Sequence, residues 1–230
     1  MKFDAVLFDC DGVLVDSEPI TNGVLRDMLQ ERGWSLTVAE CMSLFVGKTV
    51  RDEAALIEQR TGTAVTEDWL TSFRERRNEA LEERLTAITD IHDAVHRVHA
   101  HHGGRIACAS GADRFKVELM LRKLELMSYF DGRIFSGYET PRSKPFPDVY
   151  LAAAAALGAD PRRCAVVEDT VVGVTAGVAA GATVFAYSPP TSAHVNAASL
   201  REAGAHHIFT RMADLPDLLS LQTVTQLTFT

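Results

Sequence analysis

Apolar residues follow two different rhythms along the chain. Between residues 17 and 85 they recur at three- and four-residue spacing among many charges, as in TNGVLRDMLQERG and WLTSFRERRNEALEERL. This spacing is typical of amphipathic helices, and Gly33 fits the end of the first one. No strand pattern interrupts the block. This part of the chain therefore predicts a small, all-helical domain.

The second rhythm consists of short apolar runs that alternate with helical stretches. The expected strands are Ala5–Phe8, Arg105–Ala109, Arg133–Ser136, Cys164–Val167, Thr183–Tyr187 and His207–Phe209. Between them, helices are expected at Arg114–Leu124, Asp148–Leu157 and Val171–Ala180. Continuous apolar strands alternating with helices favour a parallel sheet covered on both faces. We predict a doubly wound, Rossmann-like α/β core, formed by residues 1–15 and 88–230, with an inserted all-helical cap of residues 16–87.

Polar side chains gather where the expected strands end. Three strands are followed at once by acids or by a hydroxyl and a glycine, and a fourth is followed by a loop with a lysine. These residues are Asp9, Asp11, Ser110, Gly111, Lys144, Glu168 and Asp169. In a doubly wound sheet, ligands bind beyond the carboxyl ends of the strands, near the point where the strand order reverses. We therefore expect four acids, a hydroxyl and a lysine to meet at one edge of the sheet.

A cluster of carboxylates needs a cation, because like charges held together repel each other. Oxygen ligands from carboxylates and a backbone carbonyl suit Mg²⁺. The metal, Lys144, the Ser110 hydroxyl and backbone N–H groups could then bind a phosphate. Asp9 could attack the phosphorus to form an aspartyl-phosphate, and Asp11 could protonate the leaving oxygen and later deprotonate water. The residue types thus predict magnesium-dependent phosphoryl transfer.

Four segments carry a resemblance to a known family. FDCDGVLVDSE resembles the first motif of the haloacid dehalogenase-like (HAD) hydrolase superfamily, and Ala109-Ser110-Gly111 stands where its second motif lies. SKPFPD is similar to the third motif, and VVEDTVVGVTAGVAAG resembles the acidic fourth. The helical insert resembles the cap of the phosphoglycolate phosphatase and β-phosphoglucomutase-like branch. The resemblance implies a phosphatase, that is, a phosphoric monoester hydrolase, for a sugar phosphate, phosphoglycolate or a phosphorylated sugar acid.

The resemblance also gives the four acids separate roles. It makes Asp9 the nucleophile and a metal ligand. It makes Asp11 the acid and base, and a metal ligand through its backbone carbonyl. Asp169 is implied as a metal ligand, with Glu168 in the outer shell. The plainer alternative is that Asp9 and Asp11 form a turn pair, since Asp before Gly is common in turns.

Ser110, Gly111 and Lys144 are implied to bind the phosphate. The alternatives are that Ser110 only caps the helix near Arg114 and that Lys144 is a solvated surface lysine. In the cap, Lys48 and Arg51 follow a glycine in a loop and are the candidates for selecting the substrate, because loops often carry specificity. Their alternative is a charged helix start.

A β-phosphoglucomutase-type phosphosugar mutase is the second reading of the same core. The mutase pattern has an arginine three residues after the cap-loop glycine and a histidine shortly after the first motif. This chain has Val50 and Thr21 there, with Arg51 one residue later. The segment Ser110-Gly111-Ala112-Asp113 also lacks the lysine of a mutase. A catalytically silent binding protein on the same fold is the third reading, since fold alone would permit it.

Three histidines share one helical face at His92, His96 and His99. Such spacing can bind zinc. The segment lies before a core strand, away from the strand ends that bear the acids. We therefore expect a solvated face without a catalytic role.

The composition of the chain indicates which kinds of partner it can bind. The formal net charge is −8 with dispersed positive residues, so nucleic acid and anionic membranes are poor partners. The four cysteines, Cys10, Cys41, Cys108 and Cys164, have no CxxC spacing and predict reduced, buried thiols. Neither a membrane span nor a signal-peptide pattern is evident. We expect a cytoplasmic monomer that acts on a small phosphorylated metabolite.

Overall fold

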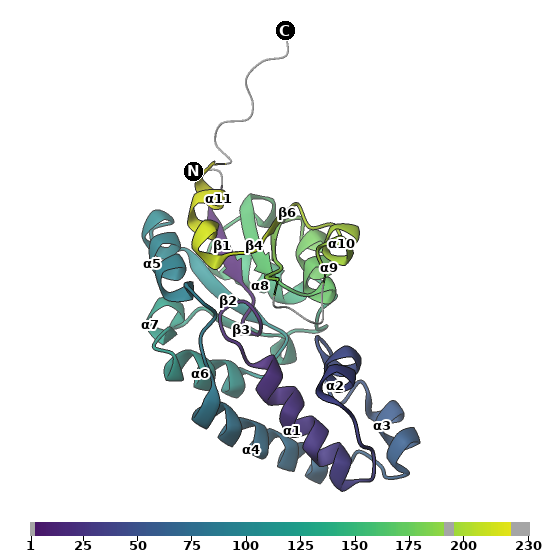
Figure 1. The fold of residues 1–230 in the computed structure, drawn as a ribbon. Coiled ribbons are helices and arrows are strands. Elements are labelled where there is room, and N and C mark those ends of the chain that lie inside the picture. The colour runs from purple at the N-terminus through teal and green to yellow at the C-terminus, as the bar shows by residue number, and fades with distance from the viewer. Residues whose placement is uncertain (1–2, 191–195, 222–230) are drawn as a thin grey trace. The chain divides into compact units, whose positions relative to one another are not determined.

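The computed structural model describes residues 3–190 and 196–221 (Figure 1). The chain divides into two compact units. The core unit contains the residues up to Val15 and those from Ala87 onward, and the helical unit is Asp16–Thr86. The sequence placed these two junctions after residues 15 and 87.

The core unit is built on a sheet of six parallel strands, in the order β3-β2-β1-β4-β5-β6. The strands are β1 (Ala5–Phe8), β2 (Ile106–Ser110), β3 (Ile134–Ser136), β4 (Cys164–Glu168), β5 (Thr183–Tyr187) and β6 (His207–Phe209). From the central β1 the chain moves outward through β2 and β3, and later outward through β4, β5 and β6 on the other side. This confirms the predicted doubly wound α/β fold and places the reversal of strand order between β1 and β4.

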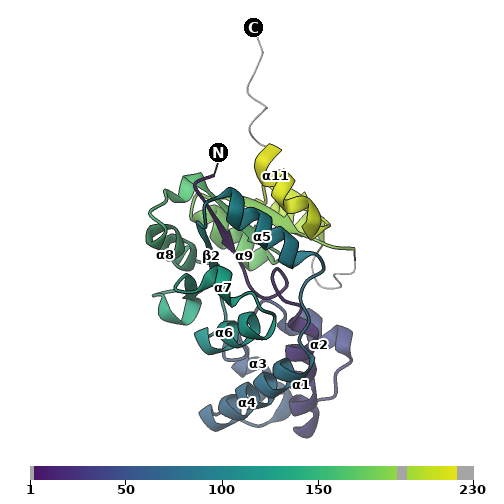
Figure 2. The same ribbon diagram turned by 90° about the vertical axis from the view of Figure 1, so that its left-hand side faces the viewer.

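Helices cover both faces of this sheet. On one face α8 (Asp148–Ala156), α9 (Val171–Ala179) and α10 (Ala197–Glu202) pack in a row. On the other, α5 (Ile91–His101) packs against α7 (Met127–Phe130) and α11 (Leu215–Leu221), and α6 (Arg114–Lys123) against α7 (Figure 2). Three 3₁₀ turns complete the described unit: η1 (Gly137–Glu139), η2 (Pro161–Arg163) and η3 (Met212–Asp214).

The strands are apolar throughout because both of their faces are buried. Alternate residues of a strand point to opposite faces. Leu7 belongs to the cluster that includes Val149 of α8, whereas Phe8 meets Phe130 of α7 edge to face at 6.0 Å. All four residues of β1 are buried. This packing fixes the carboxyl end of β1, and with it the residues that follow.

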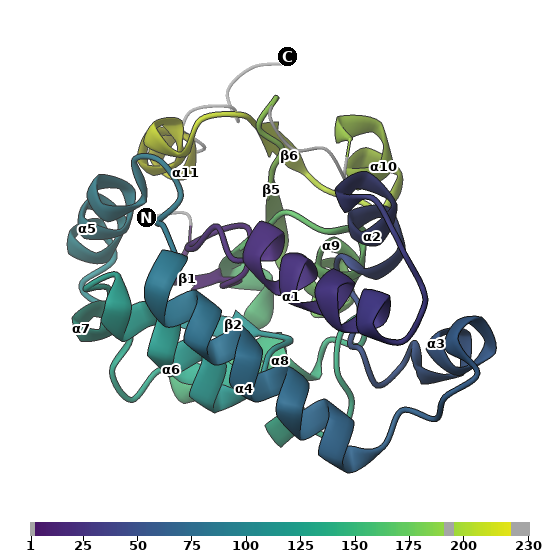
Figure 3. The same cartoon turned by 60° about the horizontal axis from the view of Figure 1, so that its bottom comes forward.

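The helical unit contains α1 (Glu18–Glu31), α2 (Val38–Phe45), α3 (Ala54–Thr61) and α4 (Glu67–Arg84). Helices α1 and α4 lie side by side (Figure 3). Its own core includes Leu25, Met28, Phe45, Ile57 and Phe73. Residues 16–86 are all described and form no strand, as the sequence predicted.

Two expectations about the whole chain can be compared with the described residues. All four cysteines are free and buried, which confirms the predicted thiols. No helix within residues 3–190 and 196–221 is long and apolar enough to cross a membrane.

Candidate active site

The candidate site lies where β1 and β4 end next to each other. These parallel strands pair Phe8 with Val167, so Asp9 and Glu168 emerge at the same edge. The backbone N–H of Asp9 also donates to the carbonyl oxygen of Val167 at 2.9 Å. The strand order reverses here, which is the position where doubly wound sheets bind ligands.

Three buried carboxylates meet at this edge. Asp9, Glu168 and Asp169 each place one oxygen within 4.8 Å of the others, and among the described residues this is the one such group suited to a metal ion. Asp9 and Asp169 are each 6% exposed and Glu168 is 1% exposed. Buried acids of this number require a compensating cation, so the donor set fits a hard divalent ion.

Lys144 joins two of these acids. Its side chain comes from the loop before α8, and its Nζ lies 2.5 Å from Asp9 Oδ1 and 2.7 Å from Glu168 Oε1. Burial alone would lower the pKa of Lys144, but the charges of Asp9 and Glu168 raise it well above its usual range. Lys144 is therefore an ammonium held between two carboxylates, as the sequence placed it.

The two acids respond differently to this cation. Burial raises the pKa of Asp9 to about 7, and Lys144 opposes the shift only in part. Burial also disfavours the Glu168 anion, yet the charge and hydrogen bond of Lys144 hold the pKa of Glu168 below its usual value. Hydrogen bonds from the Thr170 backbone and the Tyr150 hydroxyl also favour the anion of Glu168.

Glu168 has both oxygens occupied by hydrogen bonds. Oε1 accepts from Lys144 and from the hydroxyl of Tyr150 at 2.9 Å. Oε2 accepts from the backbone N–H groups of Asp169 and Thr170, at 2.9 and 3.0 Å, and from the Thr170 hydroxyl at 3.1 Å. Asp9 and Asp169 are therefore better placed than Glu168 to bind a metal directly.

Two glycines make room for the acids. A Cβ on Gly12 would lie 2.0 Å from Asp169 Oδ2, and a Cβ on Gly173 would lie 1.6 Å from Glu168 Oε1. Gly12 also has a φ of +78°, which side-chain-bearing residues rarely adopt. Both contacts are with acid side chains from the end of β4.

Asp11 makes an ion pair that the sequence did not predict. Lys116 Nζ lies 2.6 Å from Asp11 Oδ1, and the two side chains are 8% and 21% exposed. Lys116 belongs to the first turn of α6, the helix that follows β2. A lysine from beyond the second motif therefore does reach these acids. It lies three residues after Asp113, the last residue of the segment that lacks the mutase lysine.

Ser110 ends β2, the strand next to β1, and is 1% exposed. Its Oγ accepts the backbone N–H of Ala112 at 3.0 Å. The helix cap considered for Ser110 is instead Asp113, whose side chain accepts the N–H of Lys116. Ser110 thus shapes the loop between β2 and α6.

Residues missed by sequence reasoning reach the site from helices. Tyr150 lies in α8, Lys116 in α6, and Thr170 caps α9. Thr170 directly follows the acids Glu168 and Asp169, so its place in the fourth motif was an available signal. Tyr150 and Lys116 had no signal of this kind, because helix packing carries their side chains to the acids.

In the helical unit, Lys48 and Arg51 each pair with an acid. Lys48 lies 3.0 Å from Glu53, and Arg51 makes a two-point contact with Glu67 at 2.5 and 2.7 Å. All four residues belong to the same unit. These ion pairs are what a charged surface would show. The role of Lys48 and Arg51 in selecting the substrate stays a prediction.

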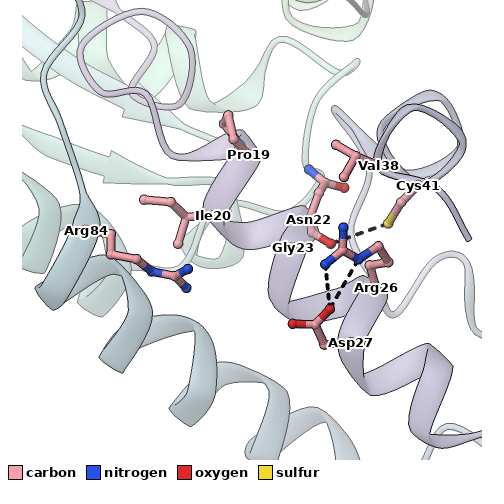
Figure 4. Close-up of a pocket in the computed structure, with 9 residues that line it drawn as sticks. All are labelled: Pro19, Ile20, Asn22, Gly23, Arg26, Asp27, Val38, Cys41 and Arg84. Carbon is pink, nitrogen blue, oxygen red and sulfur yellow. Dashed lines mark hydrogen bonds and ion pairs between the residues drawn. The ribbon is translucent and has the colours of Figure 1, made fainter.

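The same unit holds a pocket of about 210 Å³ (Figure 4). Its lining includes Asn22, Arg26 and Asp27 of α1, Cys41 of α2 and Arg84 of α4. The Arg26 guanidinium hydrogen-bonds Asp27, and the Arg84 side chain extends from α4 toward Ile20. Two guanidinium groups and an amide make the pocket polar.

The three histidines of α5 are engaged by neighbouring helices. His92 Nε2 lies 2.7 Å from the carbonyl oxygen of Leu124, and His96 Nδ1 lies 3.2 Å from the Tyr129 hydroxyl. The His99 ring meets the same tyrosine edge to face. In the described residues the metal-type cluster does not include them. They act as contacts between α5 and the chain from α6 to α7.

Sequence comparison assigns the chain to a family. The family model described as haloacid dehalogenase-like hydrolase matches residues 3–181. The chain therefore belongs to the haloacid dehalogenase-like hydrolases, which confirms the resemblance drawn from its four motifs.

Several individual proteins of known name or structure are similar to the chain. The chain is 29% identical to the 6-phosphogluconate phosphatase of Escherichia coli (strain K12) over 185 residues, which are 80% of this chain and 82% of that protein. It is 29% identical to the fructose-1-phosphate phosphatase of the same organism over 181 residues, 78% and 94% of the two chains. A crystal structure of a HAD family hydrolase from Deinococcus radiodurans R1, with bound phosphate and sodium, is 36% identical with a TM-score of 0.79, covering 96% of each chain.

Proposed function

We propose that this hydrolase is a magnesium-dependent phosphatase that forms an aspartyl-phosphate on Asp9. The enzyme class, a phosphoric monoester hydrolase acting on small phosphorylated metabolites, follows from its family and its phosphatase relatives. The observation that carries the mechanism is Asp9 itself: a buried carboxylate beside Lys144 at the reversal point of the sheet.

Asp9 and Asp169 would hold the metal, with the backbone carbonyl of Asp11. Bound Mg²⁺ would screen these acids from the phosphate and favour the ionised form of Asp9, whose pKa burial raises to about 7. Glu168 would remain in the outer shell, because its oxygens already accept hydrogen bonds from Lys144, Tyr150 and Thr170.

The chain's own residues then account for each proton and bond. Asp9 attacks the phosphorus, and Asp11 donates a proton to the oxygen that leaves. Water next attacks the phosphorus of the aspartyl-phosphate while Asp11 accepts a proton from it, so inorganic phosphate leaves and Asp9 is restored. Lys144 and the Ser110 and Gly111 loop bind the phosphate oxygens through their N–H and O–H groups.

The substrate class is a sugar phosphate, phosphoglycolate or a phosphorylated sugar acid. The named relatives act on phosphorylated sugars and a phosphorylated sugar acid, as their names state. Lys48 and Arg51 remain candidates for selecting the substrate. Arg26 and Arg84, which line the pocket of the helical unit, join them, because a guanidinium can bind a carboxylate or a hydroxyl-rich chain. Single alanine variants of these four, compared over a substrate panel, rank their contributions.

The test of the mechanism is a substitution of the nucleophile. Asp9→Asn keeps the shape of the side chain but removes the attacking anion, so phosphate release from a panel of phosphorylated metabolites with Mg²⁺ should fall about 1,000-fold or more. Asp4→Asn is the matched control, because Asp4 precedes β1 at its other end and pairs with Arg163. Acid quenching during turnover should trap phosphate on the unmodified enzyme and none on Asp9→Asn. Full activity of Asp9→Asn would rule out the covalent mechanism.

The products separate a phosphatase from a mutase. Lys116 removes one of the sequence arguments against a mutase, since a lysine does reach the acids from beyond the second motif. A phosphatase releases one phosphate for each alcohol formed. Conversion of β-glucose 1-phosphate to glucose 6-phosphate with little phosphate released would instead favour the mutase.

A further inference from the structure

Lys116 occupies an unfavourable place for a lysine. It lies in the first turn of α6, where the helix dipole disfavours positive charge, and it is 7% exposed. Lysines are rarely buried to this degree unless they are paired. Asp113 already caps the helix by accepting the N–H of Lys116 at 2.9 Å, so the helix start does not require the ammonium. A feature that works against local stability points to a role in the site.

The partner of Lys116 is the second acid of the first motif. Its Nζ lies 2.6 Å from Asp11 Oδ1, a short, charge-assisted contact. Lys144 makes the equivalent contact with Asp9 at 2.5 Å. A lysine from helix α6 and a lysine from the loop before α8 thus each hold one of two acids that are two residues apart. All of these residues belong to the core unit.

We propose that Lys116 is a positioning residue that fixes the carboxyl group of Asp11 for its two proton transfers. The inference rests on the proposed function, in which Asp11 first gives a proton to the leaving oxygen and then takes one from water. Lys116 acts through the carboxyl group of Asp11 and forms no bond to the substrate. Proton transfer needs close alignment of donor and acceptor, so a carboxyl group that turns freely transfers protons less often.

Lys116→Met tests this role because methionine keeps the apolar stem and removes the ammonium. The expected result is a fall in kcat of up to about 100-fold for an alkyl phosphate, with KM little changed. With 4-nitrophenyl phosphate, whose leaving group needs no proton, the first-turnover burst of nitrophenolate should be retained while the steady-state rate falls. Lys123→Met, which alters an exposed lysine in the last turn of α6, should leave both rates unchanged.

The decisive comparison is a double-mutant cycle with Asp11→Asn. If Lys116 acts through Asp11, then Lys116→Met should cost nothing further in the Asp11→Asn background. Lys116→Gln, which keeps a hydrogen-bond donor without the charge, is measured beside it with circular dichroism of each variant. If both Lys116 variants are folded, a loss of activity in them reports on the missing ammonium and not on unfolding.

Each outcome decides between the two hypotheses. Additive losses in the cycle would overturn the positioning role, because Lys116 would then act independently of Asp11. A raised KM with unchanged kcat would indicate that Lys116 binds the substrate instead. If Asp11→Asn lowers turnover but Lys116→Met behaves like Lys123→Met, the inference fails while the proposed function stands. Unchanged turnover in Asp11→Asn would refute the proposed function itself.

Discussion

Glu168 is a buried acid that contacts several other residues of the site by hydrogen bonds. Its two oxygens hold the ammonium of Lys144, the hydroxyl of Tyr150 and the backbone at the start of α9. Because these donors favour the anion, the pKa of Glu168 stays below its usual value despite burial. The residue therefore braces Lys144, which in turn contacts Asp9.

This arrangement depends on the missing side chain of Gly173. Gly173→Ala should push Glu168 away, since the new Cβ would lie 1.6 Å from its Oε1. We expect a loss of about 1–3 kcal/mol in the free energy of unfolding, as for other overpacked sites, together with lower activity. Urea unfolding measures the first and phosphate release the second.

Gly23→Ala is the matched control for this change. Gly23 lies in α1, and a Cβ there meets nothing within 4 Å. Alanine should stabilise the helical unit by about 0.5–1 kcal/mol, because glycine loses more backbone freedom on folding. Equal effects of the two substitutions would contradict the crowding argument.

At the scale of the element, helix α9 is joined to the acids of the site through its N-cap residue, Thr170. The Thr170 Oγ1 accepts the N–H of Gly173 at 3.0 Å and donates to Glu168 Oε2 at 3.1 Å. One hydroxyl therefore caps the helix and also fixes an acid of the site.

Thr170→Val should disturb both the cap of α9 and the position of Glu168. Loss of the cap should lower the free energy of unfolding by about 1 kcal/mol, and a looser Glu168 should lower kcat as well. Thr170→Ser keeps the hydroxyl and should retain most of both properties. Chemical denaturation and steady-state kinetics of the two variants test the pair. A serine variant as impaired as the valine variant would argue against the hydroxyl.

Helix α5 gives the opposite case, in which a suggestive pattern has a structural explanation. Replacing His92, His96 and His99 together by alanine removes contacts with Leu124 and Tyr129. Each lost hydrogen bond should cost about 0.5–1.5 kcal/mol of stability, while kcat should not change. Thermal unfolding and turnover are measured on the same preparation. A folded triple variant without activity would show that this face takes part in the chemistry.

At the scale of the whole molecule, Lys144 compensates only part of the charge of the three buried acids, so a divalent cation that binds them should stabilise the folded chain. Mg²⁺ at roughly 100 times its dissociation constant should raise the thermal midpoint by about 5–10 °C, because it binds the folded chain. Asp169→Asn should abolish this shift, since one of the two expected carboxylate ligands becomes neutral. Potassium chloride at equal ionic strength is the control. An equal shift with potassium chloride would indicate general screening of the net charge of −8.

The sequence predicted most of this molecule because its signals are local. Each strand is an apolar run, and β1, β5 and β6 begin and end at the expected residues. The short helices α2 and α3 were not placed individually, although the capping box of Thr37 and Glu40 marks the start of α2. Helix ends shift by a residue or two because the first and last turns lack part of their hydrogen bonds.

In the candidate site, too, some residues could be placed from the sequence and others could not. Asp9, Lys144, Glu168 and Asp169 could be placed because the ends of parallel strands and the loops after them share one edge. The contact of Lys116 with Asp11 could not, because it joins residues 105 positions apart through the packing of α6. The cytoplasmic location and the monomeric state stay predictions.

The central position of β1 has a consequence for how the protein is made. A ribosome releases Asp9 before either strand that neighbours β1, because β2 and β4 begin only at Ile106 and Cys164. The contiguous Asp16–Thr86 unit has its own core and can fold while the rest is still being synthesised. The carboxylate pair of Glu168 and Asp169, by contrast, cannot join Asp9 until β4 has left the exit tunnel. A nascent chain stalled before β4 would therefore carry Asp9 without Glu168 and Asp169, the two acids that lie beside it in the folded core.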